Sequence, residues 1–172
     1  MLNLSYVKRW VITDNLREIS VAEHSYRVAV IAMALIETYR SIIFATETIA
    51  AAGTHPYINS DWVIRSCLCH DVEEAYTGDV PGPDKDKTKP WPDPRTMDKG
   101  AIVVKLADII ETWTWGIMYV RNPMTRPSAF DPTATGRDVR KVMHYTQHWP
   151  EMRVAVRETI KGLFGGLTME GL

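Results

Sequence analysis

Residues 20–39 read SVAEHSYRVAVIAMALIETY, and this stretch decides the fold. Ser20 and Glu23 have the spacing of a capping box, in which each side chain accepts a hydrogen bond from a backbone amide at the start of a helix. Behind them, apolar side chains recur every three or four residues, as on one face of a helix. We therefore expect a helix that begins directly after Ser20 and runs to about Tyr39. One polar side chain, His24, interrupts the apolar stripe in its first turn.

The rest of the chain alternates between helical patterns and loops. Further helices are expected over about residues 59–78, 99–120, 135–148 and 150–164, with loops over 80–95 and 122–132. Asn59 or Ser60 should cap the second helix and Gly78 should end it, while residues 42–52 could be helix or loop. No segment shows the alternation of a strand. The sequence therefore predicts an all-α bundle of five to seven helices, forming one domain over residues 1–172.

Composition and charge exclude several classes of protein. The 172 residues carry a net charge of −1, so no basic field attracts a nucleic acid polymer or an anionic membrane. Cys67 and Cys69 are too close in sequence to brace a fold, and on a helix their side chains point to nearly opposite faces. No apolar run reaches 18 residues, and residues 1–9 lack a signal pattern. We expect a reduced, cytoplasmic protein.

Side chains that can bind a metal ion stand on three of the expected helices. Each interrupts an apolar stripe, and the set is His24, His70, Asp71 and Asp108. An unpaired buried carboxylate is costly, whereas four such groups could neutralise one another around one dication. Imidazole nitrogens and carboxylate oxygens suit zinc, manganese, iron or cobalt and leave positions open for water and substrate. The alternative, that each histidine is a hydrogen-bonded core residue, stays open at this point.

Other side chains near these residues could move protons or bind phosphate. Glu74 follows His70 by four residues, which on a helix places it on the same face, one turn further on. Its neighbour Glu73 has the position of a solvated charge. Candidate phosphate contacts are Arg9, Arg17, Lys85 and Lys105, although each could equally be an ordinary surface cation.

The order of these residues, H…HD…D, resembles the signature of the HD phosphohydrolase superfamily. The surrounding text is similar to that of bacterial 5′-deoxynucleotidases and of the related phage deoxynucleoside triphosphohydrolases. The matching segments are Arg9-Trp10, Asn15, VAEHS at 21–25, HDVEE at 70–74, TGDVP at 77–81 and KLAD at 105–108. The resemblance covers about residues 8–115, in order.

The resemblance implies a role for each matching residue. A divalent ion, zinc, cobalt, manganese or magnesium, would be bound by His24, His70, Asp71 and Asp108. Glu74 would be the acid/base residue, and Arg9 would contact the substrate phosphate and offset charge in the transition state, with Lys85 and Lys105 as further substrate contacts. Trp10 would exclude a ribose 2′-hydroxyl and Asp79 would bind the 3′-hydroxyl.

The resemblance leaves the phosphorylation state of the substrate open. Only a short, proline-rich linker separates Asp79 from the helix of Lys105, and a small chain of this kind resembles the phage enzymes that release triphosphate from dATP. We therefore expect a dATP triphosphohydrolase, with a deoxynucleoside monophosphatase as the alternative. A catalytically silent nucleotide-binding HD module is a second alternative, and an enzyme of another HD branch is disfavoured. The resemblance further implies a homo-oligomer, a dimer or higher, in bacterial or phage-infected host cytosol.

Overall fold

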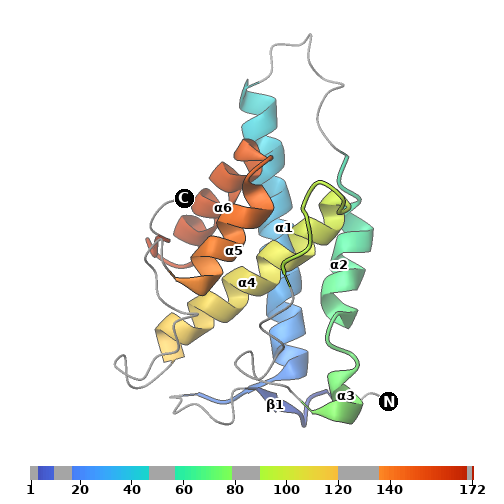
Figure 1. The fold of residues 1–172 in the computed structure, drawn as a ribbon. Coiled ribbons are helices and arrows are strands. Elements are labelled where there is room, and N and C mark those ends of the chain that lie inside the picture. Colours follow the sequence, from blue (N-terminus) through green and yellow to red (C-terminus); the bar gives the residue numbers. More distant parts are fainter. Residues whose placement is uncertain (1–3, 10–16, 47–56, 79–89, 120–135, 170–171) are drawn as a thin grey trace.

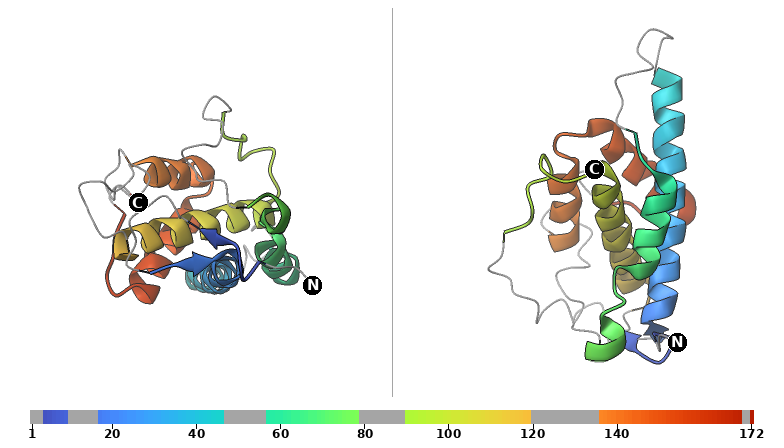
Figure 2. Two further views of the ribbon diagram at one scale, coloured as in Figure 1. Left: turned by 90° about the horizontal axis from the view of Figure 1, so that it is seen from below. Right: turned by 90° about the vertical axis from the view of Figure 1, so that its right-hand side faces the viewer.

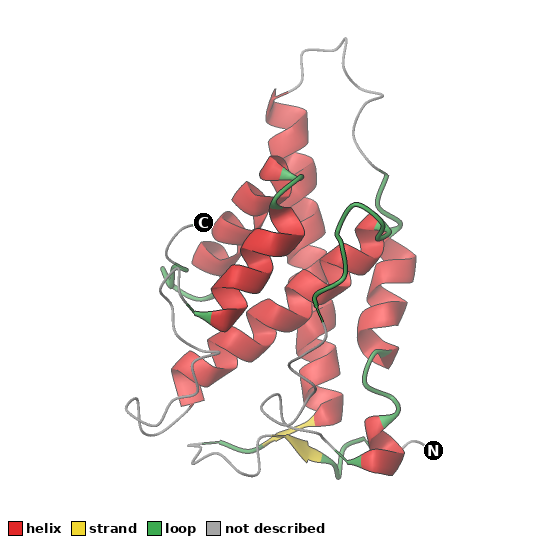
Figure 3. Cartoon of the chain, viewed as in Figure 1, coloured by secondary structure: helices red, strands yellow, loops and turns green. Residues whose placement is uncertain are grey.

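The computed structural model describes residues 4–9, 17–46, 57–78, 90–119, 136–169 and 172. Within these residues the chain forms a two-stranded ribbon and six helices (Figures 1 and 3). They are β1 (Lys8–Arg9), β2 (Ile19–Ser20), α1 (Val21–Thr46), α2 (Ser60–Cys69), α3 (Glu74–Thr77), α4 (Lys99–Tyr119), α5 (Arg137–Thr146) and α6 (Pro150–Leu163). The all-α prediction is confirmed.

Helix α1 is the long axis of the bundle, and α2, α4 and α6 all pack against it (Figure 2). Its apolar stripe supplies Val28, Ala32 and Leu35, each with no exposed surface, to a core shared with these helices. By length, and by a mean hydropathy of 1.7 in its most apolar 18-residue window, the segment Val21–Ala45 of α1 could also cross a membrane. A central core helix meets the same criterion, and the packing of α1 accounts for its apolar composition.

The start of α1 agrees with the sequence pattern, whereas its end does not. The Ser20 hydroxyl accepts a hydrogen bond from the Glu23 amide at 3.1 Å, and the Glu23 carboxylate pairs with Arg17. The predicted end near Tyr39 is wrong, because the helix continues to Thr46. Beyond Tyr39, isoleucine side chains still pack on the core and extend the apolar stripe. The rest of the ambiguous segment, residues 47–52, lies outside the described residues.

A short β ribbon precedes α1, although the sequence predicts no strand. Lys8 pairs with Ser20 and Arg9 with Ile19 in antiparallel register. The amide of Val21 also donates to the carbonyl of Val7 at 2.9 Å. A strand of two residues is too short to show an alternating pattern. Its consequence is positional, because the ribbon fixes Arg9 beside the first turn of α1.

The N-terminus of α2 is capped as predicted. The side-chain oxygen of Asn59 accepts a hydrogen bond from the amide of Trp62 at 3.1 Å. Further along, Cys67 is buried and Cys69 is exposed, as expected for two residues on nearly opposite helix faces. Burial raises the pKa of the Cys67 thiol to about 12, so Cys67 is a core residue at neutral pH and not a nucleophile.

The predicted single helix up to Gly78 is wrong, because a turn at residues 70–73 separates α2 from α3. The ring of His70 uses its Nδ1 to donate to the carbonyl of Cys67 at 2.7 Å. In a continuing helix that carbonyl would accept from the amide of Asp71. The His70 side chain thus provides a donor to a carbonyl in the last turn of α2. Gly78, with a φ of +74°, then ends α3 as predicted.

Helices α4, α5 and α6 lie close to their predicted positions. The Asp98 carboxylate accepts from the amide of Gly100 at 2.8 Å and caps α4. The absence of a side chain at Gly100 allows close packing with α2, since an added Cβ would lie 3.0 Å from the ring of Trp62. Pro150 begins α6, as expected. Residues 90–98 contain no helix, whereas residues 80–89 and 122–132 of the predicted loops lie outside the described residues.

Candidate metal centre

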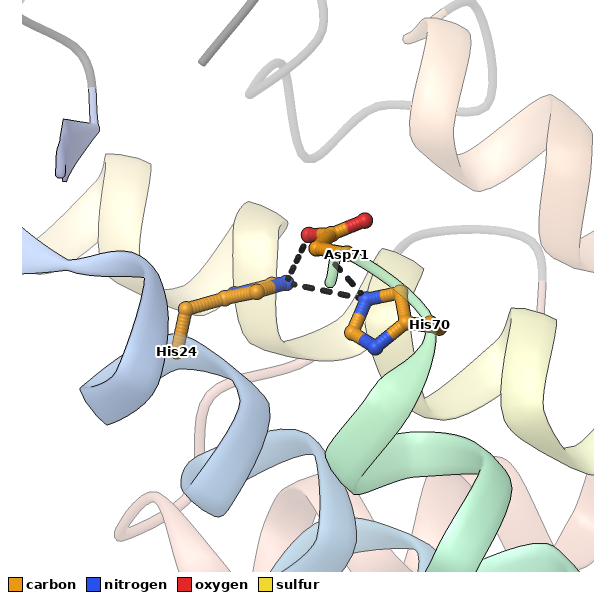
Figure 4. Close-up of side chains that lie close together, drawn as sticks. All are labelled: His24, His70 and Asp71. Atoms are coloured by element: carbon orange, nitrogen blue, oxygen red, sulfur yellow. Dashed lines mark hydrogen bonds and ion pairs between the residues drawn. The ribbon is translucent and has the colours of Figure 1, made fainter. Parts of the chain in front are cut away.

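Three of the predicted ligands meet where the first turn of α1 faces the end of α2 (Figure 4). The Nε2 atoms of His24 and His70 lie 3.3 Å apart. The Asp71 Oδ2 atom lies 3.5 Å from His24 Nε2 and 3.3 Å from His70 Nε2. The potential ligand atoms of the three residues all lie within 4.8 Å of one another, which is the scale of a site for one ion.

Asp108 reaches the same pair of histidines from α4. Its Oδ1 atom lies 3.3 Å from His24 Nε2 and 3.8 Å from His70 Nε2. Both histidines therefore face both carboxylates. His24 and Asp108, which are 84 positions apart in the chain, meet here because α4 packs against α1. His70 reaches the same place because α2 also packs against α1.

The hydrogen bonds on the far side of each ring show that this donor set fits a metal ion. His70 Nδ1 contacts the Cys67 carbonyl at 2.7 Å, and His24 Nδ1 contacts the Glu111 carboxylate at 2.6 Å. A carbonyl and a carboxylate oxygen only accept, so each Nδ1 carries the hydrogen. When such a ring is neutral, it turns the lone pair of Nε2 toward the cluster, which is the form that binds a metal.

The electrostatics of the cluster favour a positive charge at its centre. Burial alone would lower the pKa of His24, but hydrogen bonds to Asp108 and Glu111 outweigh it and raise the pKa to about 9. Burial would likewise raise the pKa of Asp108, but the adjacent His24 and His70 rings hold it well below its ordinary value. The two carboxylates thus stabilise positive charge at the centre, which a proton on His24 or a divalent cation bound at its Nε2 would supply.

Arg9, a predicted phosphate contact, is held at the edge of this cluster. Its Nη1 atom donates to Asp71 Oδ2 at 2.7 Å, and only 8% of Arg9 is exposed. That oxygen is the one that faces both histidines. The β ribbon therefore places a guanidinium group next to the candidate metal ligands.

The structure describes three of the other predicted site residues, and one of them, Arg17, is exposed and pairs with Glu23. Glu74 is buried at the start of α3, and Lys105 is exposed on α4, one turn before Asp108. The expectation that Glu74 shares one continuous helix with His70 is wrong, because of the turn at residues 70–73. Three predicted substrate contacts lie outside the described residues, namely Trp10, Asp79 and Lys85.

The sequence pattern missed the role of a buried carboxylate, Glu111. Its Oε2 atom contacts His24, and its Oε1 atom lies 3.2 Å from the Nε of Arg27. Glu111 stands three residues after Asp108 on the same apolar stripe, which is the signal that could have identified it.

A second buried carboxylate lies nearby on α5. Asp138 is 1% exposed and forms ion pairs with Arg137 at 3.5 Å and with Lys141 at 3.7 Å. Burial outweighs the attraction of these two cations, and the charge of Asp108 adds repulsion, so the pKa of Asp138 rises to about 6.

A helical fold that brings two histidines and two aspartates together in the order H…HD…D defines the class of HD-type metal-dependent phosphohydrolases. A family model described as 5′-deoxynucleotidase YfbR-like matches residues 1–91, just over half of the 172-residue chain. The chain belongs to this family and is a metal-dependent phosphohydrolase that acts on deoxynucleotides. No curated protein matches the chain significantly. The matched region contains His24, His70 and Asp71, whereas Asp108 lies beyond it.

Proposed function

We propose that this protein is a 5′-deoxynucleotidase, which hydrolyses a deoxynucleoside 5′-monophosphate to a deoxynucleoside and inorganic phosphate. The observation that carries the proposal is the YfbR-like family match over the segment that supplies His24, His70 and Asp71. The expectation of a dATP triphosphohydrolase rests on chain length and resemblance alone. The family match favours the monophosphatase alternative, so we take the monophosphate as the substrate.

We expect His24, His70, Asp71 and Asp108 to bind one divalent ion. The two imidazole nitrogens favour zinc, cobalt or manganese over magnesium, which prefers oxygen ligands. When bound, such an ion polarises a phosphoryl oxygen and lowers the pKa of water. The inward-facing Nε2 atoms support this assignment, because the acceptors at Nδ1 of both rings favour the tautomer that binds a metal.

Arg9 is suited to bind the substrate phosphate. Its guanidinium group, fixed on Asp71 at 2.7 Å, offers donors in a planar arrangement that matches phosphate oxygens. As the P–O bond to the sugar breaks, negative charge grows on the phosphoryl group and on the leaving oxygen. A fixed cation at this position lowers the energy of that state. Lys85 and Lys105 are proposed as additional contacts on the phosphate side.

Glu74 is proposed to move the proton. The carboxylate would accept a proton from the attacking water as the new P–O bond forms, and return it to the 5′-oxygen as the old bond breaks. The burial of Glu74 in α3 supports this role, because a solvated helix-end charge would be exposed like Glu73. For the sugar, we propose that Trp10 occupies the space of a 2′-hydroxyl and that Asp79 binds the 3′-hydroxyl.

The remaining proposals concern the state of the protein in the cell. We infer one HD domain over residues 1–172, since a single apolar cluster joins Val28 of α1 to Met169 near the C-terminus. We further propose a cytoplasmic homo-oligomer, a dimer or higher, that acts on a free deoxynucleotide and binds neither a nucleic acid polymer nor a membrane.

The test is a substrate panel with the metal varied. The protein is incubated with each deoxynucleoside mono- and triphosphate in cobalt, manganese, zinc or magnesium, and the products are separated by chromatography. We expect inorganic phosphate and deoxynucleoside from the monophosphates. Triphosphate released from dATP would instead establish the triphosphohydrolase, and metal binding without hydrolysis would indicate the silent module.

A further inference from the structure

Helix α4 contacts both nitrogens of the His24 ring. Asp108 lies 3.3 Å from Nε2, on the side of the candidate metal centre, and Glu111 lies 2.6 Å from Nδ1 on the opposite side. The two carboxylates are three residues apart, so they share one face of α4. The imidazole of His24, which has no exposed surface, is therefore held between two carboxylates of one helix.

Glu111 has a hydrogen-bond partner at one carboxylate oxygen and an ion-pair partner at the other. Oε2 accepts from His24 Nδ1, and Oε1 lies 3.2 Å from the Nε of Arg27 on α1. Only 2% of the Glu111 side chain is exposed. A buried carboxylate is retained at low cost only where such partners replace water. Arg27 and His24 are three residues apart on α1, so the same two helices supply the whole chain of contacts.

The two histidines of the cluster differ in the group behind them. His70 Nδ1 donates to a neutral backbone carbonyl, that of Cys67, whereas His24 Nδ1 donates to the Glu111 carboxylate. An anionic acceptor draws the Nδ1 hydrogen more strongly and leaves more electron density on Nε2. His24 should consequently be the stronger donor of the pair.

We propose that Glu111, held in place by Arg27, is a positioning residue for the metal centre. It fixes His24 in the Nδ1–H tautomer, orients Nε2 toward His70, Asp71 and Asp108, and increases the affinity of Nε2 for a divalent ion. Glu111 touches neither substrate nor metal in this role. The inference rests on the proposed metal-binding function and extends it to a residue outside the H…HD…D order.

The test compares Glu111→Ala and Glu111→Gln with the full-length wild type. The alanine variant removes the acceptor, while the glutamine variant keeps one oxygen that can accept from His24. In the glutamine variant the side-chain NH2 group faces Arg27, and both of these groups are hydrogen-bond donors. We therefore expect Glu111→Gln to restore only part of the metal affinity that Glu111→Ala loses. Glu37→Ala is the matched control, because it removes an exposed ion pair with Arg40 on α1, 13 residues beyond His24.

Affinity for cobalt or zinc is measured by competition with a chelator, on protein shown to be folded by circular dichroism. We expect a loss of about 10- to 100-fold for Glu111→Ala, the range typical of outer partners of metal ligands, and a smaller loss for Glu111→Gln. Glu37→Ala should bind as the wild type does. If the alanine variant does not fold, the glutamine variant decides the question.

The tautomer of His24 provides a second readout that a purely structural role would not change. Nitrogen-15 NMR of the metal-free protein, recorded above the pKa of His24 so that the ring is neutral, should show Nδ1–H for His24 in the wild type and a shift toward Nε2–H in Glu111→Ala. Unchanged affinity and an unchanged tautomer in folded variants would overturn the inference while the metal centre stands. A wild type that binds no divalent ion would overturn the proposed function itself.

Discussion

The histidine half and the carboxylate half of the cluster are built differently. The side chains of His24 and His70 are 0% and 13% exposed, and each has its outer nitrogen fixed by an acceptor. The side chains of Asp71 and Asp108 are 17% and 28% exposed, and the Oδ2 atom of Asp71 also accepts a hydrogen bond from Arg9. The histidines thus form the inner, less exposed side of the candidate metal centre, while the carboxylates form its more exposed side.

The largest effect should come from removing a carboxylate of the cluster. Asp108→Asn deletes the charge that faces both histidines, so metal affinity should fall by more than about 100-fold, beyond the cost of losing an outer partner, and hydrolysis should stop. Asp138→Asn is the matched control, since it removes a buried carboxylate on the adjacent helix and should retain the metal. Calorimetric titration with cobalt checks both, and full binding by Asp108→Asn would show that Asp108 is not part of the centre.

Glu74 separates proton transfer from metal binding. Glu74→Ala should lower turnover by about 10²–10⁴, the usual contribution of a positioned acid/base group, while the metal stays bound. Its exposed neighbour provides the control, because Glu73→Ala should leave turnover unchanged. Loss of the metal in Glu74→Ala would recast Glu74 as a ligand, and near-normal turnover would exclude it from the chemistry.

Asp138 is a buried carboxylate with no histidine beside it among the contacts described above, and burial raises its pKa. We expect this raised pKa to make the free energy of unfolding depend on pH. Its pKa is raised from 3.8 to about 6, chiefly by burial and against the attraction of Lys141 and Arg137, with Asp108 adding repulsion. The folded state therefore binds this proton more tightly than the unfolded state. The resulting stabilisation, about 3 kcal/mol for such a difference in pKa, is complete below pH 3.8 and is lost as the pH rises through 6.

The variant Asp138→Asn has no titrating carboxyl group at this position, so its free energy of unfolding should not fall over this pH range as that of the wild type does. Its free energy of unfolding relative to the wild type should thus increase by up to about 3 kcal/mol between pH 4 and pH 7. Urea denaturation at several pH values measures the difference. Parallel curves for the two proteins would mean that Asp138 has an ordinary pKa in the folded state.

The smallest expected effect concerns the sugar side of the site. If Trp10 fills the space of a 2′-hydroxyl, Trp10→Ala should weaken the preference for deoxyribose by about 1–3 kcal/mol, or roughly 5- to 150-fold, the cost of overpacking a rigid site. The ratio of kcat/KM for matched deoxy- and ribonucleotides measures it, with metal content as the control. An unchanged ratio would assign Trp10 to packing alone.

The parts of the fold that depend on local spacing could be predicted from the sequence. The Ser20 cap, the start of α2 at Asn59 and the bounds of α4 follow from cap residues and apolar periodicity, which act within a few residues. The order His24, His70, Asp71 and Asp108 could be predicted because each residue interrupts an apolar stripe. The structure brings these four side chains together, and their binding of a metal stays a prediction.

The features that the sequence pattern missed depend on contacts that spacing does not encode. At the turn after α2, the His70 ring bonds to the backbone carbonyl of Cys67, a side-chain contact that apolar spacing does not predict. Glu111 meets His24 across 87 residues, a contact set by the packing of α4 on α1. The family match also ends at residue 91, so it does not include Asp108, which the structure places 3.3 Å from His24 Nε2 as the sequence pattern predicts.

The central claim is that His24, His70, Asp71 and Asp108 together bind one divalent ion. The most direct test is a crystal of the protein grown with cobalt or zinc, with anomalous data collected at the absorption edge of the metal. We expect one peak per chain, about 2.0–2.3 Å from Nε2 of both histidines and from an oxygen of both aspartates. A crystal with no peak among these four side chains, or with the metal bound elsewhere, would contradict the account.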